Sequence, residues 1–243
     1  IPLFKSAKRI LVLCDMPDAW PPPCIRPLPM GSQELKMRMK YEPHEWEVAP
    51  VSDEWQWLAA CAANTFSQFG EDGIVAAFFK KYEPHNRTCF EVGAADGVFF
   101  SNTLALRKSG WDAVLIEPDP EAYSRLLSFA GPNVKCVCDA VGPSGGKIDD
   151  ILGRYQIPHD LDLGVIDIDG ADYWAWHDME KFRPRLMLVE FQQQPPGLDP
   201  PPKNAGMRQQ AGEQAIAKLA IDKGYVPIVR TRVNLICVDG SVL

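Results

Sequence analysis

The feature that most constrains the fold of this chain is a repeated alternation of short apolar runs and amphipathic segments. Apolar runs without polar alternation occupy residues 88–92, 113–116, 134–139, 163–168 and 186–191, and a helical pattern follows each of the first four. Such runs are typical of strands that are buried on both faces. The sequence therefore predicts an α/β fold with a mostly parallel, Rossmann-like sheet and helices on both of its faces.

The C-terminal part predicts a different ending for the sheet. A helical pattern over 209–223 stops at Gly224, a residue that is favoured just after a helix. Two further apolar runs, 225–230 and 235–238, are expected to close the sheet as an antiparallel hairpin. Residues 192–206 are rich in Gln, Pro and Gly, and we expect them to form a loop.

The first 60 residues differ in character from the rest. Residues 20–29 contain several prolines, which a helix interior excludes because proline lacks the N–H donor, so an extended strap is expected. A strand is expected over 9–14 and a helix over 53–64. We therefore divide the chain into an N-terminal extension, 1–60, with a Pro-rich strap and a helix, and one α/β domain, 61–243. The strap could pack on the core, cover a substrate or contact another copy of the chain.

The charge and cysteine content restrict the expected partners and location. Lys and Arg total 25 against 32 for Asp and Glu, a formal net charge of -7, which disfavours binding to nucleic acid or to an anionic membrane. No apolar run approaches the ~18–20 residues of a membrane span, and no signal peptide is visible. The seven cysteines are scattered and odd in number, which favours a reduced, cytoplasmic protein.

A glycine-containing turn with acidic residues follows the first core strand. The segment EVGAADG, Glu91 to Gly97, lies between an apolar run and a predicted helix, where glycines let a ligand approach the backbone. Glu117 comes 20 residues after Gly97, at the end of the next predicted strand. An acid at that place can accept hydrogen bonds from both hydroxyls of a ribose.

The charge of this turn indicates which nucleotide it binds. A dinucleotide site has a third glycine and holds a diphosphate against the turn, whereas here the third glycine is absent and Asp96 lies in the loop. A carboxylate repels a diphosphate but attracts ammonium and sulfonium groups. The sequence therefore favours S-adenosylmethionine over NAD as the cofactor, and a transferase over an oxidoreductase.

Acidic residues also end two later strands. Asp167 and Asp169 lie at the carboxyl end of the run 163–168, and Glu190 lies at the end of the following run. Open α/β sheets bind ligands at this edge. The three acids could bind a divalent cation such as Mg through oxygen ligands, or position a substrate hydroxyl and accept its proton. The alternative is that some of them, or Asp172, only cap the helix that follows.

Six segments in fixed order resemble the FkbM-type family of S-adenosylmethionine-dependent methyltransferases, across about residues 64–240. The matching pieces are SQFGED (67–72), EVGAADGVFFSNT (91–103), GWDAVLIEPDP (110–120), DAVG (139–142), IDIDGADYW (166–174) and RPRLMLVEF (183–191). Residues before 60 match no motif of the family. The resemblance implies a class I methyltransferase sheet and identifies 61–243 as an S-adenosylmethionine-binding methyltransferase domain.

The resemblance also implies roles for individual residues. It places Glu91, Gly93, Asp96 and Gly97 at the methionine end of the cofactor, Glu117 at the ribose, Asp139 and Ala140 beside the adenine, and Gln68, Ser101 and Asn102 as further cofactor contacts. It places Asp167 and Asp169 toward the transferred methyl group, although the family often has Glu where Asp169 stands.

The expected reaction follows from these roles. Asp167, Asp169 and Glu190 are the candidate catalytic residues, with Asp169 or Glu190 as the base, or with all three holding a Mg ion that acidifies the acceptor. The family implies O-methylation of a small molecule, sugar or natural product, so a small-molecule or glycan acceptor is expected. An N-methyltransferase and a non-catalytic protein that binds the cofactor are the alternatives. The oligomeric state is left open.

Overall fold

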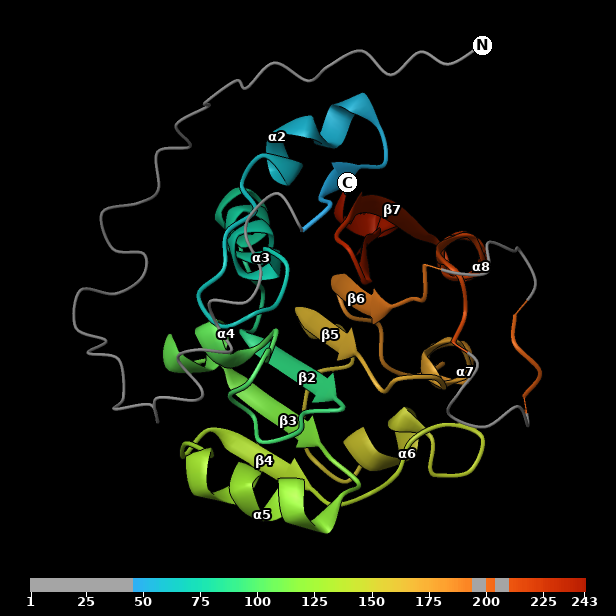
Figure 1. Ribbon diagram of the computed structural model, residues 1–243. Coiled ribbons are helices and arrows are strands. Elements are labelled where there is room, and N and C mark those ends of the chain that lie inside the picture. Colours follow the sequence, from blue (N-terminus) through green and yellow to red (C-terminus); the bar gives the residue numbers. More distant parts are fainter. Residues whose placement is uncertain (1–45, 194–199, 204–209) are drawn as a thin grey trace.

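The structure, a computed structural model, describes residues 46–193, 200–203 and 210–243 (Figure 1). The predicted strand at 9–14 and the Pro-rich strap at 20–29 lie outside the described residues, as does much of the predicted loop 192–206. The helices of the described part include none with the length and apolarity of a membrane span.

One eight-stranded sheet forms the centre of the described structure (Figure 1). Its strands follow the spatial order β1-β7-β8-β6-β5-β2-β3-β4. Strands β2 to β6 pair in parallel, and β8 pairs antiparallel with both β6 and β7. The strands are β1 (Ala49–Pro50), β2 (Thr88–Val92), β3 (Asp112–Ile116), β4 (Val134–Val137), β5 (Leu163–Ile166), β6 (Leu186–Glu190), β7 (Tyr225–Arg230) and β8 (Asn234–Asp239).

The predicted fold class is confirmed, including the mostly parallel sheet and the closing antiparallel hairpin. The order of the last two strands adds a detail: β8, the final strand, inserts between β6 and β7. Since β8 runs antiparallel to both neighbours, β7 runs in the same direction as β6.

Helices cover both faces of the sheet, as expected (Figure 1). On one face α6, α7 and α8 bury residues such as Ile151, Trp176 and Ile216, and on the other α2 to α5 bury residues such as Leu58, Phe78 and Leu126. The helices are η2 (Asp53–Trp55), α2 (Gln56–Ala59), α3 (Glu71–Lys81), α4 (Leu104–Lys108), α5 (Pro120–Phe129), α6 (Ile148–Leu152), α7 (Asp172–His177), α8 (Glu213–Asp222) and η3 (Gly240–Val242).

Two predicted helices are shorter than their sequence patterns, and local contacts explain why. The pattern over 209–223 becomes helical only at Glu213, because Gln192 and Gly212 form a β-bridge just before it. The expected helix near 173–180 is α7, which ends at His177. The chain then turns where the buried Asp149 carboxylate accepts the backbone N–H groups of residues 180–182.

The predicted helix at 53–64 is also shorter and irregular. Residues 53–55 form a 3-10 turn and the α-helix α2 ends at Ala59. Beyond it, the Asp72 carboxylate accepts the backbone N–H groups of residues 65–67. These bonds favour a tight turn over a longer helix, because a side chain that binds backbone N–H groups competes with the helical ladder.

The described part of the N-terminal extension packs on the sheet. Strand β1 pairs with β7, so that Ala49 lies opposite Arg230, and it covers the edge of the sheet at that side. Trp55 and Leu58 are buried in the core beneath it. Residues 46–60 therefore contribute to the same core as the α/β domain.

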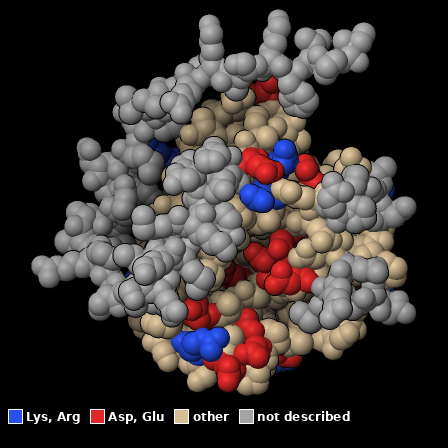
Figure 2. Space-filling view, viewed as in Figure 1, with Lys and Arg blue, Asp and Glu red and all other residues tan. Residues whose placement is uncertain are grey.

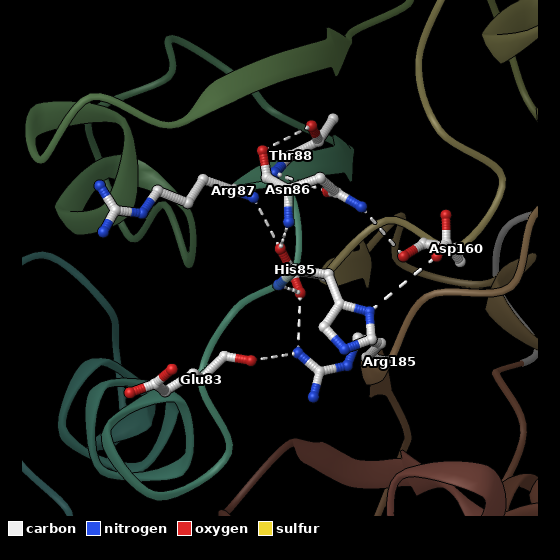
Figure 3. Close-up of polar contacts among 8 residues, drawn as sticks. Glu83, His85, Asn86, Arg87, Thr88, Asp160 and Arg185 are labelled. Atoms are coloured by element: carbon white, nitrogen blue, oxygen red, sulfur yellow. Dashed lines mark hydrogen bonds and ion pairs between the residues drawn. The ribbon is translucent and has the colours of Figure 1, made fainter.

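A buried ion pair joins the amino ends of three strands (Figure 3). Asp162, which precedes β5, is fully buried and accepts the backbone N–H groups of residues 85–87. The Arg185 guanidinium, just before β6, donates to the same carboxylate at 3.0 Å and to the Glu83 carbonyl. Asp162 thereby holds together the starts of β2, β5 and β6, at the edge opposite the glycine turn.

We predict that Asp162→Ala lowers the free energy of unfolding by about 3 kcal/mol, because it leaves the Arg185 charge and three backbone N–H groups without their acceptor. Asp160→Ala is the matched control, since the Asp160 side chain is 73% exposed and its contact with His85 is long, at 4.0 Å. The control should stay within about 0.5 kcal/mol of the natural protein. Urea unfolding measures both, and equal stability of the two variants would contradict the prediction.

Candidate functional site

The sequence-predicted residues lie mainly at one edge of the sheet. Strands β2, β3, β5 and β6 are parallel, so the segments that follow them meet at their common carboxyl edge (Figure 1). Figure 2 shows Asp and Glu side chains gathered on this face, over the ends of β5 and β6. In open α/β sheets this edge is where ligands bind.

The turn after β2 crosses the ends of both neighbouring strands. The N–H groups of Gly93 and Ala94 both donate to the Ile116 carbonyl at the end of β3. Gly93 has φ +81°, and a Cβ atom there would overlap the Asp167 carbonyl oxygen beyond β5. Only glycine permits so close an approach. The glycine turn and the acids of β5 are consequently direct neighbours.

Two acids shape the glycine turn itself. The Oδ1 atom of the half-buried Asp96 accepts the N–H groups of Val98 and Phe99 at 2.9 and 2.8 Å. Glu117, at the end of β3, accepts the Ala95 N–H through Oε2 and the Asp119 N–H through Oε1, both at 2.8 Å. A carboxylate oxygen has two lone pairs, so both acids retain capacity for further donors.

Glu91 is engaged by the segment that precedes α4. Its buried carboxylate accepts the hydroxyls of Ser101 and Thr103 and the backbone N–H of Asn102. These bonds explain why α4 begins at Leu104 although the helical pattern starts at residue 101. The predicted cofactor contacts Glu91, Ser101 and Asn102 are therefore brought together by the structure.

Asn102 carries an open acceptor. Its side chain is 4% exposed, and among the described residues its Oδ1 atom has no hydrogen-bond partner. Leaving a buried amide oxygen unpaired is costly, which makes a donor supplied by a ligand a natural complement.

The remaining predicted cofactor contacts lie farther along the chain. Asp139 follows β4 at the same carboxyl edge, accepts the N–H of Ala140 and forms an ion pair with Arg154 at 3.3 Å. Gln68 lies in the turn before α3, where its carbonyl oxygen accepts the Asn64 amide. No described contact joins Gln68 to the glycine turn.

The three candidate catalytic acids form one group. The Asp167 and Glu190 carboxyls lie close enough to influence each other's ionisation. Burial, and then the neighbouring carboxylates, raise the pKa of both groups. Glu190 Oε2 also accepts the Asp169 N–H at 3.2 Å and the Gln210 side-chain amide at 2.7 Å. Asp169 is exposed and has φ +55°, an unusual backbone conformation that tends to occur at functional sites.

Asp172 holds the turn that carries Asp169. It is buried and accepts the N–H groups of Ile168 and Gly170 at 2.8 and 3.0 Å. Burial raises the pKa of Asp172 to about 6. Asp172 thus closes the turn that precedes α7 and does not cap the helix, whose N-cap residue, Ala171, makes no side-chain cap hydrogen bond.

The Mg alternative receives no support from the geometry. No group of three or more His, Cys, Asp or Glu side chains in the described part of the chain is arranged to hold a metal ion. Glu190 Oε2 also already accepts two N–H donors.

Two residues of the site have no role in the sequence interpretation. Gln210 reaches Glu190 from the far end of a long loop, and no sequence pattern indicates this contact. Arg107 donates to the Gly97 carbonyl and to the Thr103 hydroxyl. The four-residue spacing of Thr103 and Arg107 on a helical pattern could have indicated their contact.

The comparisons with known proteins find solved structures that are similar to this chain at low identity. No family model and no curated protein matches the chain. A methyltransferase from Aquifex aeolicus, described as SAM dependent, is 12% identical over 68% of this chain and 89% of its own, with a TM-score of 0.42. A TehB-like SAM-dependent methyltransferase from Corynebacterium glutamicum is 14% identical over 76% of this chain and 94% of its own, with a TM-score of 0.44. The N-terminal domain of EvdMO1, solved with SAH bound, is 12% identical over 86% of this chain and 98% of its own, also with a TM-score of 0.44.

The raised pKa values of Asp167 and Glu190 predict a pH dependence of stability. Asp167 and Glu190 have folded-state pKa values above the usual carboxyl value of about 4, so the folded protein holds more protons than the unfolded chain. Their contribution to the free energy of unfolding is complete below about pH 4. It decreases as the pH rises, by up to about 1.4 kcal/mol per pH unit for each proton that the folded protein holds in excess.

We therefore expect Glu190→Gln to flatten the decrease in unfolding free energy between about pH 5 and pH 8, because it removes one of the two coupled groups. Asp160→Asn, a change at an exposed carboxylate, serves as the control and should keep the slope of the natural protein. Urea unfolding at several pH values measures the slopes. An unchanged slope in the Glu190 variant would show that Glu190 does not have a raised pKa in the folded protein.

Proposed function

We propose that this protein is an S-adenosylmethionine-dependent methyltransferase that methylates an oxygen atom of a small-molecule or glycan acceptor, with the FkbM-type enzymes as its relatives. The observation that carries the proposal is the contact between Glu117 and the acidic glycine turn at the carboxyl edge of the sheet. This pairing provides acceptors for a ribose and for a cation within one short stretch of backbone.

The residues of the turn fit S-adenosylmethionine in their chemistry. The cofactor carries an ammonium and a sulfonium group, and the carboxylates of Asp96 and Glu117 retain acceptor capacity beside the turn. The buried Oδ1 atom of Asn102 has no donor among the described residues, and an ammonium group could supply one. The Asp96 carboxylate disfavours a dinucleotide, whose diphosphate would lie against the turn.

When bound, S-adenosylmethionine supplies an electrophilic methyl group on sulfur. The residues of this chain align the acceptor oxygen with that methyl group and take the hydroxyl proton, so that the new C–O bond forms as the C–S bond breaks. Alignment of this kind can contribute ~7–11 kcal/mol to lowering the barrier. Asp169 is the proposed base, because its side chain is exposed, while Glu190 is occupied by Gln210 and the Asp169 N–H.

N-methylation is the second candidate. The carboxylates at the ends of β5 and β6 would attract a protonated amine as readily as they would accept a hydroxyl proton. Incubation of the protein with methyl-labelled cofactor and a cell extract, followed by identification of the labelled product, distinguishes the two. Cofactor binding without any labelled product would favour a non-catalytic binding protein.

A cytoplasmic location is part of the same proposal. Four cysteines of the described residues, Cys89, Cys136, Cys138 and Cys237, are free thiols, and free thiols are typical of reducing compartments.

For the cofactor site we predict that Asp96→Asn and Glu117→Gln each weaken binding of S-adenosylhomocysteine by about tenfold or more, because each removes a charge or an acceptor that the ligand would use. Asparagine and glutamine keep one acceptor oxygen for the turn, so the fold should persist. Glu121→Gln, an exposed change in the first turn of α5, is the charge-matched control. Titration calorimetry measures all three, and unchanged affinity in both site variants would refute the cofactor site.

For the catalytic step, Asp169→Asn should keep the affinity for S-adenosylhomocysteine and lose at least about 100-fold in methyl transfer to the acceptor, the scale of general-base catalysis. Turnover is followed with labelled cofactor once an acceptor has been found in the extract. Retained turnover in this variant would exclude Asp169 as the base.

A further inference from the structure

The glycine turn concentrates negative charge before any cationic ligand arrives. Glu91, Asp96 and Glu117 all hydrogen-bond the backbone or hydroxyl groups of residues 95–103, so three carboxylates lie along one short segment. Like charges at such separations repel one another, and the effect is strongest where burial excludes water. A cation in contact with this segment therefore stabilises the folded turn.

Arg107 is a cation in that position. It lies on α4, and its guanidinium donates to the Gly97 carbonyl, to the Ser101 hydroxyl and to the Thr103 hydroxyl. The two hydroxyl contacts are both 3.2 Å long. Arg107 thus joins the last residue of the glycine turn to the segment that leads into α4.

The chemistry of the side chains determines which group donates and which accepts in each of these hydrogen bonds. Arginine has only donors, so the hydroxyls of Ser101 and Thr103 accept from Arg107. Each hydroxyl has a single proton, which then points to Glu91 Oε2, at 2.7 Å from Ser101 and 2.5 Å from Thr103. The positive guanidinium is linked in this way to the buried Glu91 carboxylate through two hydroxyl groups.

The position of Gly97 depends on the same contact. Gly97 has φ +72°, and a Cβ atom there would collide with Leu126 of α5. Its carbonyl is held by Arg107. The turn is therefore fixed from the side of α4 and α5, which leaves Asp96 Oδ2 and the outer lone pairs of Glu117 available to a ligand.

We infer that Arg107 is a positioning residue for the cofactor site: it is the internal counterion that keeps the acidic turn assembled in the form that binds S-adenosylmethionine. The inference rests on the proposed function. The Arg107 guanidinium donates to a backbone carbonyl and two hydroxyl groups of the turn and the segment after it. Arg107 therefore affects the cofactor through Gly97 and Glu91, and not by direct contact.

Three variants test this inference by calorimetric titration with S-adenosylhomocysteine. Arg107→Met keeps an unbranched apolar stem but removes the charge and the donors, and we expect about a ten- to hundredfold loss of affinity. Arg107→Lys keeps the charge without the planar array of donors, so a smaller loss is expected. Arg125→Met, at an exposed position on α5, removes one positive charge without touching the turn and should bind as the natural protein does.

A purely packing role predicts a different result. In that case methionine should serve as well as lysine, and the loss of affinity in each variant should be proportional to its loss of thermal stability. Equal losses in the two variants, or an affinity of Arg107→Met within about twofold of the natural protein, would overturn the inference. Should Arg107→Met fail to fold, Arg107→Gln, which keeps a donor without the charge, replaces it in the comparison with lysine.

Hydrogen exchange of the ligand-free proteins separates this inference from the proposed function. The amides of residues 93–103 should exchange faster in Arg107→Met than in the natural protein or in Arg125→Met, because the turn opens more often. If the natural protein did not bind S-adenosylhomocysteine at all, the proposed function would fail, while these exchange rates would still decide whether Arg107 holds the turn. Equal rates in all three proteins would show that it does not.

Discussion

The close approach of the chain at Gly93 is the constraint on which the rest of the site depends. A side chain there would overlap the Asp167 carbonyl, so the turn after β2 can lie across the end of β5 only because residue 93 is glycine. This crossing places the acidic turn, Glu117 and the acids of β5 and β6 at one edge of the sheet. The proposed site for a cationic nucleoside and the proposed base are thereby brought next to each other.

The acidic residues of this protein divide into two kinds. Asp72, Asp149 and Asp162 each accept three backbone N–H groups, and Asp172 accepts two, so these carboxylates close turns in the interior of the fold. The acids at the carboxyl edge instead keep acceptor capacity, as Glu117 does, or have raised pKa values, as Asp167 and Glu190 do. The acidic residues thus stabilise the fold in one set of places and are proposed to serve ligand chemistry in another.

The sequence predicted the sheet well and the ends of the helices poorly. Strands such as β2 and β6 appear as short, mainly apolar runs because both of their faces are buried, and the helix α5 matches its pattern because Asp119 and Pro120 define its start. The start of α4 could not be predicted, since it depends on the bonds that Glu91 makes with residues 101–103. The insertion of β8 between β6 and β7 likewise depends on pairing between distant segments.

Within the site, the sequence identified the acids but not their partners. Asp96, Glu117, Asp167, Asp169 and Glu190 were indicated by their places after predicted strands, and the structure brings these strand ends to one edge. Arg107 and Gln210 act on that edge through contacts that only the folded chain creates. Asp172 illustrates the same limit, because its position suggested a helix cap, whereas its bonds make it the support of the Asp169 turn.

The central claim is that the turn after β2 receives a positively charged nucleoside. A crystal structure after separate soaks with S-adenosylhomocysteine and with a nucleoside diphosphate tests it most directly. The account predicts density for the first ligand only, with its ribose hydroxyls on Glu117 and its amino group near Asp96 and Asn102. A diphosphate lodged against the turn, or side chains filling the space beside it in both crystals, would contradict the account.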